Sequence, residues 1–185
     1  MITRVNLFVV VVPLFLALLV SLAIYYLLRM RKASSATWSD ILNRLIEVDR
    51  DRIAFVALDL VNETGKQREV GDSEIDPSNL WDLIGGIDGL EVLEKNCDVF
   101  IDLACYVQRW HPEALVVAEQ LRLNAREIKW HVARLKGAQE TGNLRSSYPL
   151  YAQRAVATYY IMTRHLLALY EQGNLVELAQ LQAVI

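Results

Sequence analysis

The sequence predicts an all-α protein in which a single N-terminal transmembrane helix precedes a helical bundle. Three observations lead to this prediction. The run Val5–Leu28 contains no charged residue. The rest of the chain repeats apolar residues at spacings of three and four, the period of an amphipathic helix. No stretch shows the strict alternation of a half-buried strand. We expect four main helices and two short ones in the bundle.

The run Val5–Leu28 is long enough to cross a bilayer. A helix rises about 1.5 Å per residue, so the run reaches about 36 Å, against a hydrocarbon core of about 30 Å. A cleaved signal peptide is the alternative, with a cleavage site at Ser34–Ala36. Against it, the run is about twice as long as a signal core, and basic residues precede that site. We therefore expect residues 1–28 to be a retained anchor.

The flanking charges predict the orientation of this anchor. Three basic residues follow it in a juxtamembrane linker, residues 29–36, whereas only Arg4 and the amino terminus precede it. Positive charge is retained in the cytoplasm, so the domain of residues 37–185 is expected there and the N-terminus outside. The expected localisation is that of a single-pass protein of a membrane such as the bacterial inner membrane.

The domain is predicted to begin with a helix from Thr37 to about Asn62, opened by a sequence similar to a capping box. Its inward positions are Ile41, Leu45, Val48, Ile53, Val56 and Leu60. A polar, acidic loop, Glu63–Asn79, follows. A loop of this length is either functional or a tolerated insertion.

Asp76 and Pro77 together form a helix start, so a short helix is expected over Pro77–Ile84, ended by Gly85 and Gly86. These glycines do not predict a phosphate-binding loop. No strand precedes them, and the spacing of such loops is absent.

Three long helices are then expected at about Asp88–Trp110, Pro112–Gly137 and Pro149–Glu171, followed by a short one at Asn174–Ile185. The first carries an acidic stripe and the second a basic one, formed by Glu91, Glu94, Asp98 and Asp102 and by Arg122, Arg126, Lys129 and Lys136. The third is apolar nearly all round, which is typical of a buried central helix.

The charge distribution is more informative than the net charge of −3, which gives no reason to expect nucleic acid as a partner. From Asp59 to Asp102, twelve acidic and three basic residues give −9. From Leu103 to Arg164, nine basic and four acidic residues give +5. Either these parts neutralise each other inside one fold, or they face different partners.

Cys97 and Cys105 lie eight residues apart in one predicted helix, which separates them by about 12 Å. A disulfide needs Cα atoms within about 7 Å, so we expect two buried free thiols, as suits the cytoplasm. Their spacing does not predict a zinc site.

The main candidate site residues are Asp98, Asp102, Arg154 and Arg164. The two arginines lie in the most apolar helix, and a buried arginine needs a partner. The carboxylates of the acidic helix are four residues apart and share one face. The sequence therefore predicts that at least one arginine forms a buried ion pair with Asp98 or Asp102.

The secondary candidates are His131 and His165. Neither lies in the Glu-x-x-His pattern of di-iron bundles, so no metal or other cofactor is expected. The segment His131–Ala138 resembles the His-x-x-Lys-Gly motif of histidine phosphotransfer domains, but Lys136 stands five residues after the histidine rather than three.

No nucleophile elbow, zinc-protease motif or Walker loop occurs. The sequence favours a non-enzymatic membrane protein whose partners are the lipid bilayer and other membrane or cytoplasmic proteins. The expected role is an accessory or scaffold subunit of a membrane complex. The alternative is a metal-dependent or other enzyme with a site around His131 and His165.

Overall fold

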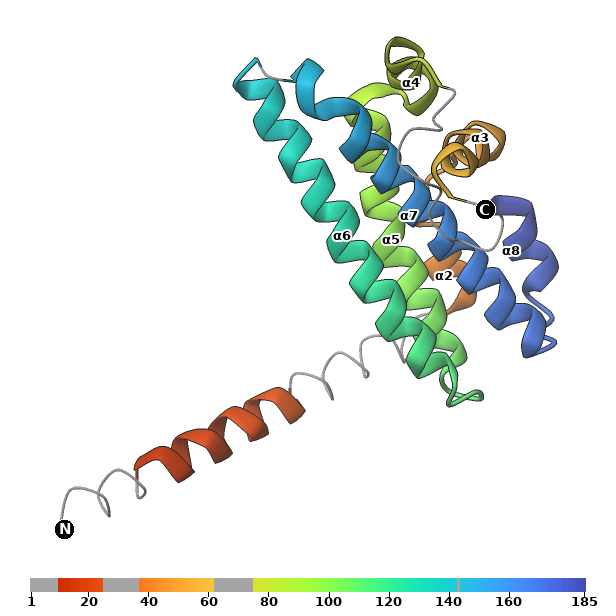
Figure 1. The fold of residues 1–185 in the computed structure, drawn as a ribbon. Helices are drawn as coiled ribbons and strands as arrows, with labels where there is room; N and C mark the ends of the chain where they lie inside the picture. The colour runs from red at the N-terminus through yellow and green to blue at the C-terminus, as the bar shows by residue number, and fades with distance from the viewer. Residues whose placement is uncertain (1–9, 25–36, 62–74, 143) are drawn as a thin grey trace. The chain divides into compact units, whose positions relative to one another are not determined.

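The computed structural model describes residues 10–24, 37–61, 75–142 and 144–185 (Figure 1). The chain divides into two compact units, Met1–Thr37 and Trp38–Ile185. The described residues are all-α, with no strand among them, as the sequence predicts.

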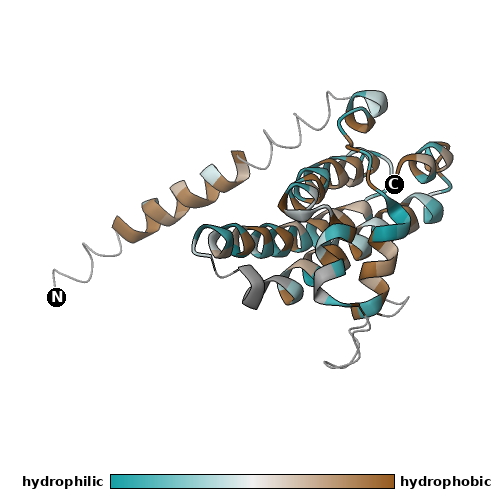
Figure 2. Cartoon of the chain, turned by 90° about the horizontal axis from the view of Figure 1, so that it is seen from above, coloured by the Kyte–Doolittle hydropathy of each residue, from teal (hydrophilic) through white to brown (hydrophobic). Residues whose placement is uncertain are grey.

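In the first unit, residues 10–24 form one helix, and all of its side chains are exposed. Most of this helix is coloured hydrophobic in Figure 2. Of the helices within the described residues, none combines the length and apolar composition that a membrane span requires. Residues 5–9 and 25–28 of the predicted anchor, and the basic linker at residues 29–36, lie outside the described residues.

The second unit is built on three long helices that run side by side: α5 (Gly86–Val107), α6 (Ala114–Glu140) and α7 (Leu144–Gln172) (Figure 1). Among the residues of this unit that the structure describes, four shorter helices pack around them, namely α2 (Trp38–Leu42), α3 (Arg50–Leu60), α4 (Pro77–Ile84) and α8 (Leu178–Val184). Helix α2 contacts α5, α3 contacts α7 and α4, and α8 contacts α7. This arrangement corrects the predicted division into four main and two short helices.

The core lies between the three long helices. Its largest fully buried side chains include Phe100, Leu103, Leu121, Ile128, Met162, Leu166 and Tyr170. The Tyr170 hydroxyl donates to the Leu103 carbonyl oxygen at 3.1 Å, which ties α7 to α5. Burying each large apolar side chain contributes about 1.5–3 kcal/mol, so these positions dominate the stability of the bundle.

The predicted helix Thr37–Asn62 is wrong, because the chain leaves the helix after α2 and restarts at α3. Asn96 of α5 accepts a hydrogen bond from the Ile46 amide at 2.9 Å and donates one to the Ile46 carbonyl at 2.7 Å. Asp49 then caps α3 by accepting from the Arg52 amide at 3.1 Å. The partners that replace helical hydrogen bonds come from another helix, so the helical spacing of the segment could not reveal the break.

Most of the other boundaries lie within three residues of the predicted ones. Two starts differ more: α7 begins at Leu144, so that Pro149 lies inside it, and α8 begins at Leu178 rather than Asn174. The bounds of α4 agree at both ends. Helix α5 begins at Gly86 rather than Asp88, because Gly85 takes a left-handed conformation with φ 77° and the chain turns there. A Cβ atom on Gly89 would lie 1.9 Å from the Ile84 carbonyl oxygen, so the α4–α5 junction requires glycine. The predicted loop Glu63–Asn79 lies mostly outside the described residues.

Candidate functional site

The four residues of the predicted ion-pair site are not brought together, and this corrects the prediction. Asp98 pairs with Lys129 of α6, with 3.2 Å between Oδ1 and Nζ. Asp102 accepts from Arg44 at 2.8 Å. The side chain of Asp98 is 57% exposed and that of Asp102 is 36% exposed, so neither pair is buried.

The two arginines of α7 also differ from the prediction. Arg164 is exposed. Arg154 is half-buried, and its Nε atom is buried without a hydrogen-bond partner. Their long aliphatic stems can cover apolar surface while the charged ends stay near water. An arginine in an apolar helix therefore does not have to bring a carboxylate into the core.

The acidic stripe of α5 is paired instead with α6. Besides the Asp98–Lys129 pair, Lys136 lies 2.8 Å from Glu91. The hydrogen bond and charge of Lys136 lower the pKa of Glu91, and Glu91 raises the pKa of Lys136 in turn. Part of the acidic region is thus neutralised by the basic region inside the same domain. Both pairs are solvated, so they add little to the stability of the domain.

Both cysteines lie in α5 as thiols, and of the two only Cys97 is buried as predicted. Cys97 is buried, and burial raises its pKa to about 12, so this thiol stays protonated and unreactive. Cys105 is half-buried, and its sulfur accepts from Arg122 at 3.3 Å.

His131 is the secondary candidate that the bundle buries. Its side chain lies in α6 with only 2% of the residue exposed, and neither ring nitrogen has a hydrogen-bond partner. Nε2 is 3.6 Å from Glu127 Oε1, which is beyond hydrogen-bonding distance. Burial lowers the pKa of His131 and Arg154 lowers it further, whereas Glu127 opposes the shift. The imidazole is therefore neutral near pH 7.

Aromatic and cationic side chains surround this histidine. The ring centroids of Trp130 and Tyr151 lie 5.0 and 5.6 Å from that of His131. The Arg134 guanidinium lies 5.1 Å from the Trp130 centroid, and Arg134 also donates to the Tyr151 hydroxyl at 3.4 Å. We call Trp130, His131, Arg134 and Tyr151 the α6–α7 aromatic cluster. In this cluster Trp130 and Arg134 are exposed and Tyr151 is half-buried, whereas the imidazole of His131 is buried.

This geometry limits the chemistry of the two histidines. His165 is exposed on α7, fourteen residues after Tyr151, which places it about 20 Å farther along that helix. The two histidines therefore do not share a site. Among the described residues, no group of three or more His, Cys, Asp or Glu side chains is placed to hold a metal ion. The ring nitrogens of His131 are also not open to a phosphoryl donor.

The outer face of α6 carries a feature that the sequence analysis did not identify. Val116, Leu123 and Trp130 are 73%, 57% and 51% exposed. Their spacing of seven residues places them in one line along the helix, about 20° apart per step. They lie opposite the buried positions Leu121 and Ile128. We call these three residues the outer column. The seven-residue spacing was readable from the sequence, but only the fold shows that this line faces away from the core.

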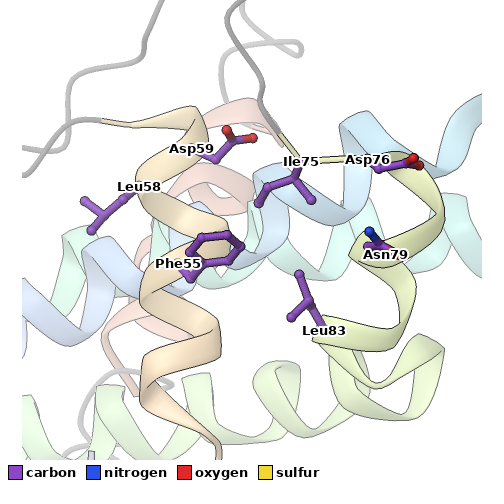
Figure 3. A pocket seen from close by; sticks show the side chains of 7 residues that line it. All are labelled: Phe55, Leu58, Asp59, Ile75, Asp76, Asn79 and Leu83. Atoms are coloured by element: carbon purple, nitrogen blue, oxygen red, sulfur yellow. The ribbon is translucent and has the colours of Figure 1, made fainter.

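A shallow pocket lies between α3 and α4, with a volume of about 480 Å³ (Figure 3). Its apolar lining comes from Phe55, Leu58, Ile75 and Leu83, and its polar lining from Asp59, Asp76 and Asn79. Figure 3 shows Phe55 on the side of α3 that faces α4. Asp59 also accepts from Gln153 at 2.9 Å, which links the pocket to α7. The lining suits a small apolar group next to a positive charge.

Comparison of the chain with protein-family models, curated proteins and solved structures gave no match. The function must therefore be argued from the arrangement of residues alone.

Proposed function

We propose that this chain is a single-pass membrane protein that presents a helical interaction domain, residues 37–185, at the cytoplasmic face of the membrane. It acts there as an accessory or scaffold subunit of a membrane complex. The anchor is residues 5–28, whose composition is uncharged and apolar. The basic linker at residues 29–36 sets its orientation.

The observation that carries this proposal is the outer column of α6. Three large apolar side chains that face water on one line are costly to leave exposed, since apolar surface gains about 25 cal/mol per Å² when buried. Apolar patches rimmed by charged residues mark protein interaction sites. Trp and Arg, which the column and its rim contain, are enriched among residues that dominate binding energy.

Two measurements test the anchor. The full chain should remain in the membrane fraction after an alkaline wash, and a chain lacking residues 1–36 should not. A reporter fused after Ile185 should be active in the cytoplasm. Activity only on the far side would reverse the proposed orientation, and release of the full chain by the wash would contradict the anchor.

A third measurement tests the interaction domain. Chemical crosslinking in native membranes, followed by purification of the tagged full chain, should yield crosslinked complexes. Leu123→Glu should reduce them, because it places a charge in the outer column. The matched control is Val176→Glu, at a residue that is 93% exposed outside the column. Equal yields from both variants would contradict a role for this face.

The alternative function is a metal-dependent or other enzyme that uses His131 or His165. The observation in its favour is the buried imidazole of His131, whose nitrogens are both unpartnered. Metal analysis of the purified full chain separates the two functions. Stoichiometric iron, zinc or manganese that is lost in His131→Phe would favour the alternative over the interaction domain.

A further inference from the structure

The outer face of α6 has charges that change sign along the helix. Glu113 directly precedes α6 and Glu119 lies before Leu123, whereas Arg126 and Arg134 lie after Leu123. One exposed carboxylate, Glu127, also lies after Leu123, on the side of Arg134. Leu123, the middle of the outer column, stands between them. At 100° per residue, Glu119 and Arg126 fall on one side of the column, and Glu113 and Arg134 fall on the other. The face is therefore acidic before Leu123, carries two arginines and Glu127 after it, and is apolar along its centre.

Such a face is complementary to itself when a second copy runs in the opposite direction. When a twofold axis passes beside Leu123, a residue a given number of positions before Leu123 in one copy stands opposite the residue that number of positions after it in the other. The numbers of two opposed residues therefore add to about 246. Val116 then meets Trp130 of the second copy, and Leu123 meets its own equivalent. Leu115, which is 45% exposed, adjoins the same Trp130. Each end of the pairing buries one tryptophan against two aliphatic side chains.

The charges agree with the same axis. Glu119 stands opposite Arg126 of the second copy, and Glu113 stands opposite Arg134. The twofold axis repeats each contact, so four interhelical ion pairs flank the apolar centre. A parallel pairing would instead leave Glu119 of one copy and Arg126 of the other about 10 Å apart along the helix axis, so these ion pairs would not form.

We propose that the outer face of α6 pairs antiparallel with α6 of a second copy of this chain, with the twofold axis near Leu123. The interface is isologous and closed, as in most soluble homodimers. This inference rests on the proposed function, because it names a second copy as the partner of the interaction domain.

The first test is the mass of the purified full chain in detergent, measured by light scattering with the detergent contribution subtracted. The wild-type chain should have a protein mass twice that of the 21.1 kDa monomer. Leu123→Glu should weaken the dimer by at least about tenfold, a cost of about 1.4 kcal/mol. The control Val176→Glu should not weaken it. A wild-type monomer at the highest concentration reached would overturn the proposal.

The second test fixes the direction of pairing with single cysteines, each made in the full chain with Cys105→Ala. Leu123→Cys should form a disulfide dimer, because the two equivalents meet on the axis. Val116→Cys alone should not, because its equivalent lies about 21 Å away along the helix. A mixture of Val116→Cys and Trp130→Cys chains should form the mixed dimer. Self-dimers at both positions would indicate parallel pairing and overturn the proposal.

The third test reverses one pair of charges. Glu119→Arg should weaken the dimer, because it faces Arg126 of the second copy. Adding Arg126→Glu in the same chain should restore it. The internal contact of Glu119 with Arg122 is not restored by the second change, so recovery reports the contact between copies. Failure of the double variant to recover would overturn the proposed register.

Different results would contradict the pairing with a second copy and the proposed membrane anchor. If Leu123→Cys crosslinks only to other proteins, the second copy is wrong and the interaction domain stands. If the alkaline wash releases the chain while the dimer persists, the anchor is wrong and the pairing stands.

Discussion

Asn96 and His131 are both polar and both buried on the long helices, but their surroundings differ. Asn96 is fully buried and makes three hydrogen bonds, two to Ile46 and one to the Tyr159 hydroxyl at 3.2 Å. His131 is almost as deeply buried and makes none through its ring nitrogens. The imidazole is held instead by Trp130 and Tyr151, whose rings pack against it.

The difference shows two ways in which a bundle keeps a polar side chain inside. Asn96 replaces the backbone hydrogen bonds that the chain loses between α2 and α3, and so it determines where that chain runs. Burial lowers the pKa of His131, so the imidazole stays neutral inside the bundle, and its burial becomes sensitive to protons. The first arrangement stabilises one conformation. The second costs desolvation free energy without a compensating hydrogen bond.

The largest expected effect is at Asn96. Asn96→Leu leaves the Ile46 amide and carbonyl without their partners, so we expect the free energy of unfolding to fall by about 3 kcal/mol. The measurement is urea denaturation of the full chain in detergent. The control is Asn124→Leu, which loses one hydrogen bond with Gln120 and should cost about 1 kcal/mol. Similar losses for the two variants would contradict the special role of Asn96.

The next expected effect is an increase in the free energy of unfolding. His131→Phe removes an unpartnered buried imidazole and keeps a ring for Trp130 and Tyr151 to contact. We expect it to raise the free energy of unfolding at pH 7 by about 1 kcal/mol, because no hydrogen bond is lost. The same denaturation series measures it. A large destabilisation would show that the imidazole has a hydrogen-bond partner in solution, such as a buried water.

The pH dependence of stability should follow His131. Because the folded pKa lies below the ordinary value of about 6.5, the unfolded chain binds more protons between the two pKa values. Stability should therefore be full above pH 6.5 and decrease as the pH falls from there toward the folded pKa. Arg154→Met should make this decrease smaller, because the charge of Arg154 lowers that pKa.

The control for this pH series is His131→Phe, which should remove the decrease in that window. His165→Phe should leave it unchanged, because His165 is exposed. An equal decrease in wild type and His131→Phe would assign the pH dependence to other groups.

The smallest effect is expected at the ion pair between α5 and α6. Lys129→Ala should cost about 1 kcal/mol or less, and added salt should reduce the difference, because both side chains are solvated. A double-mutant cycle with Asp98→Ala measures the coupling. A coupling of 3 kcal/mol or more would mean that this pair is buried in solution and would restore a buried role for Asp98.

Much of the fold could be predicted from local patterns. Pro77–Ile84 is bounded by an Asp-Pro start and a glycine stop, and both signals act within the segment itself. The helical spacing of apolar residues likewise predicted the buried positions Ile41 and Val56. The break between α2 and α3 could not be predicted, because its cause is Asn96, which is fifty residues away in the sequence.

The candidate site was harder to predict than the fold. Asp98 and Asp102 were correctly placed on one face of a helix, but the sequence could not show that this face is met by Lys129 and Arg44. Periodicity gives the direction of a side chain relative to its own helix only. Which helix lies opposite depends on how the helices pack.

The sequence by itself determined the helical class, most helix ends, the uncharged run Val5–Leu28 and the two cysteines too far apart to bridge, because caps, breakers and period act over a few residues. Only the tertiary structure decided the partners of Asp98 and Asp102, the burial of His131 and the exposure of the outer column. Each of these depends on contacts between helices that are distant in the chain, and such contacts form only when the whole bundle has packed.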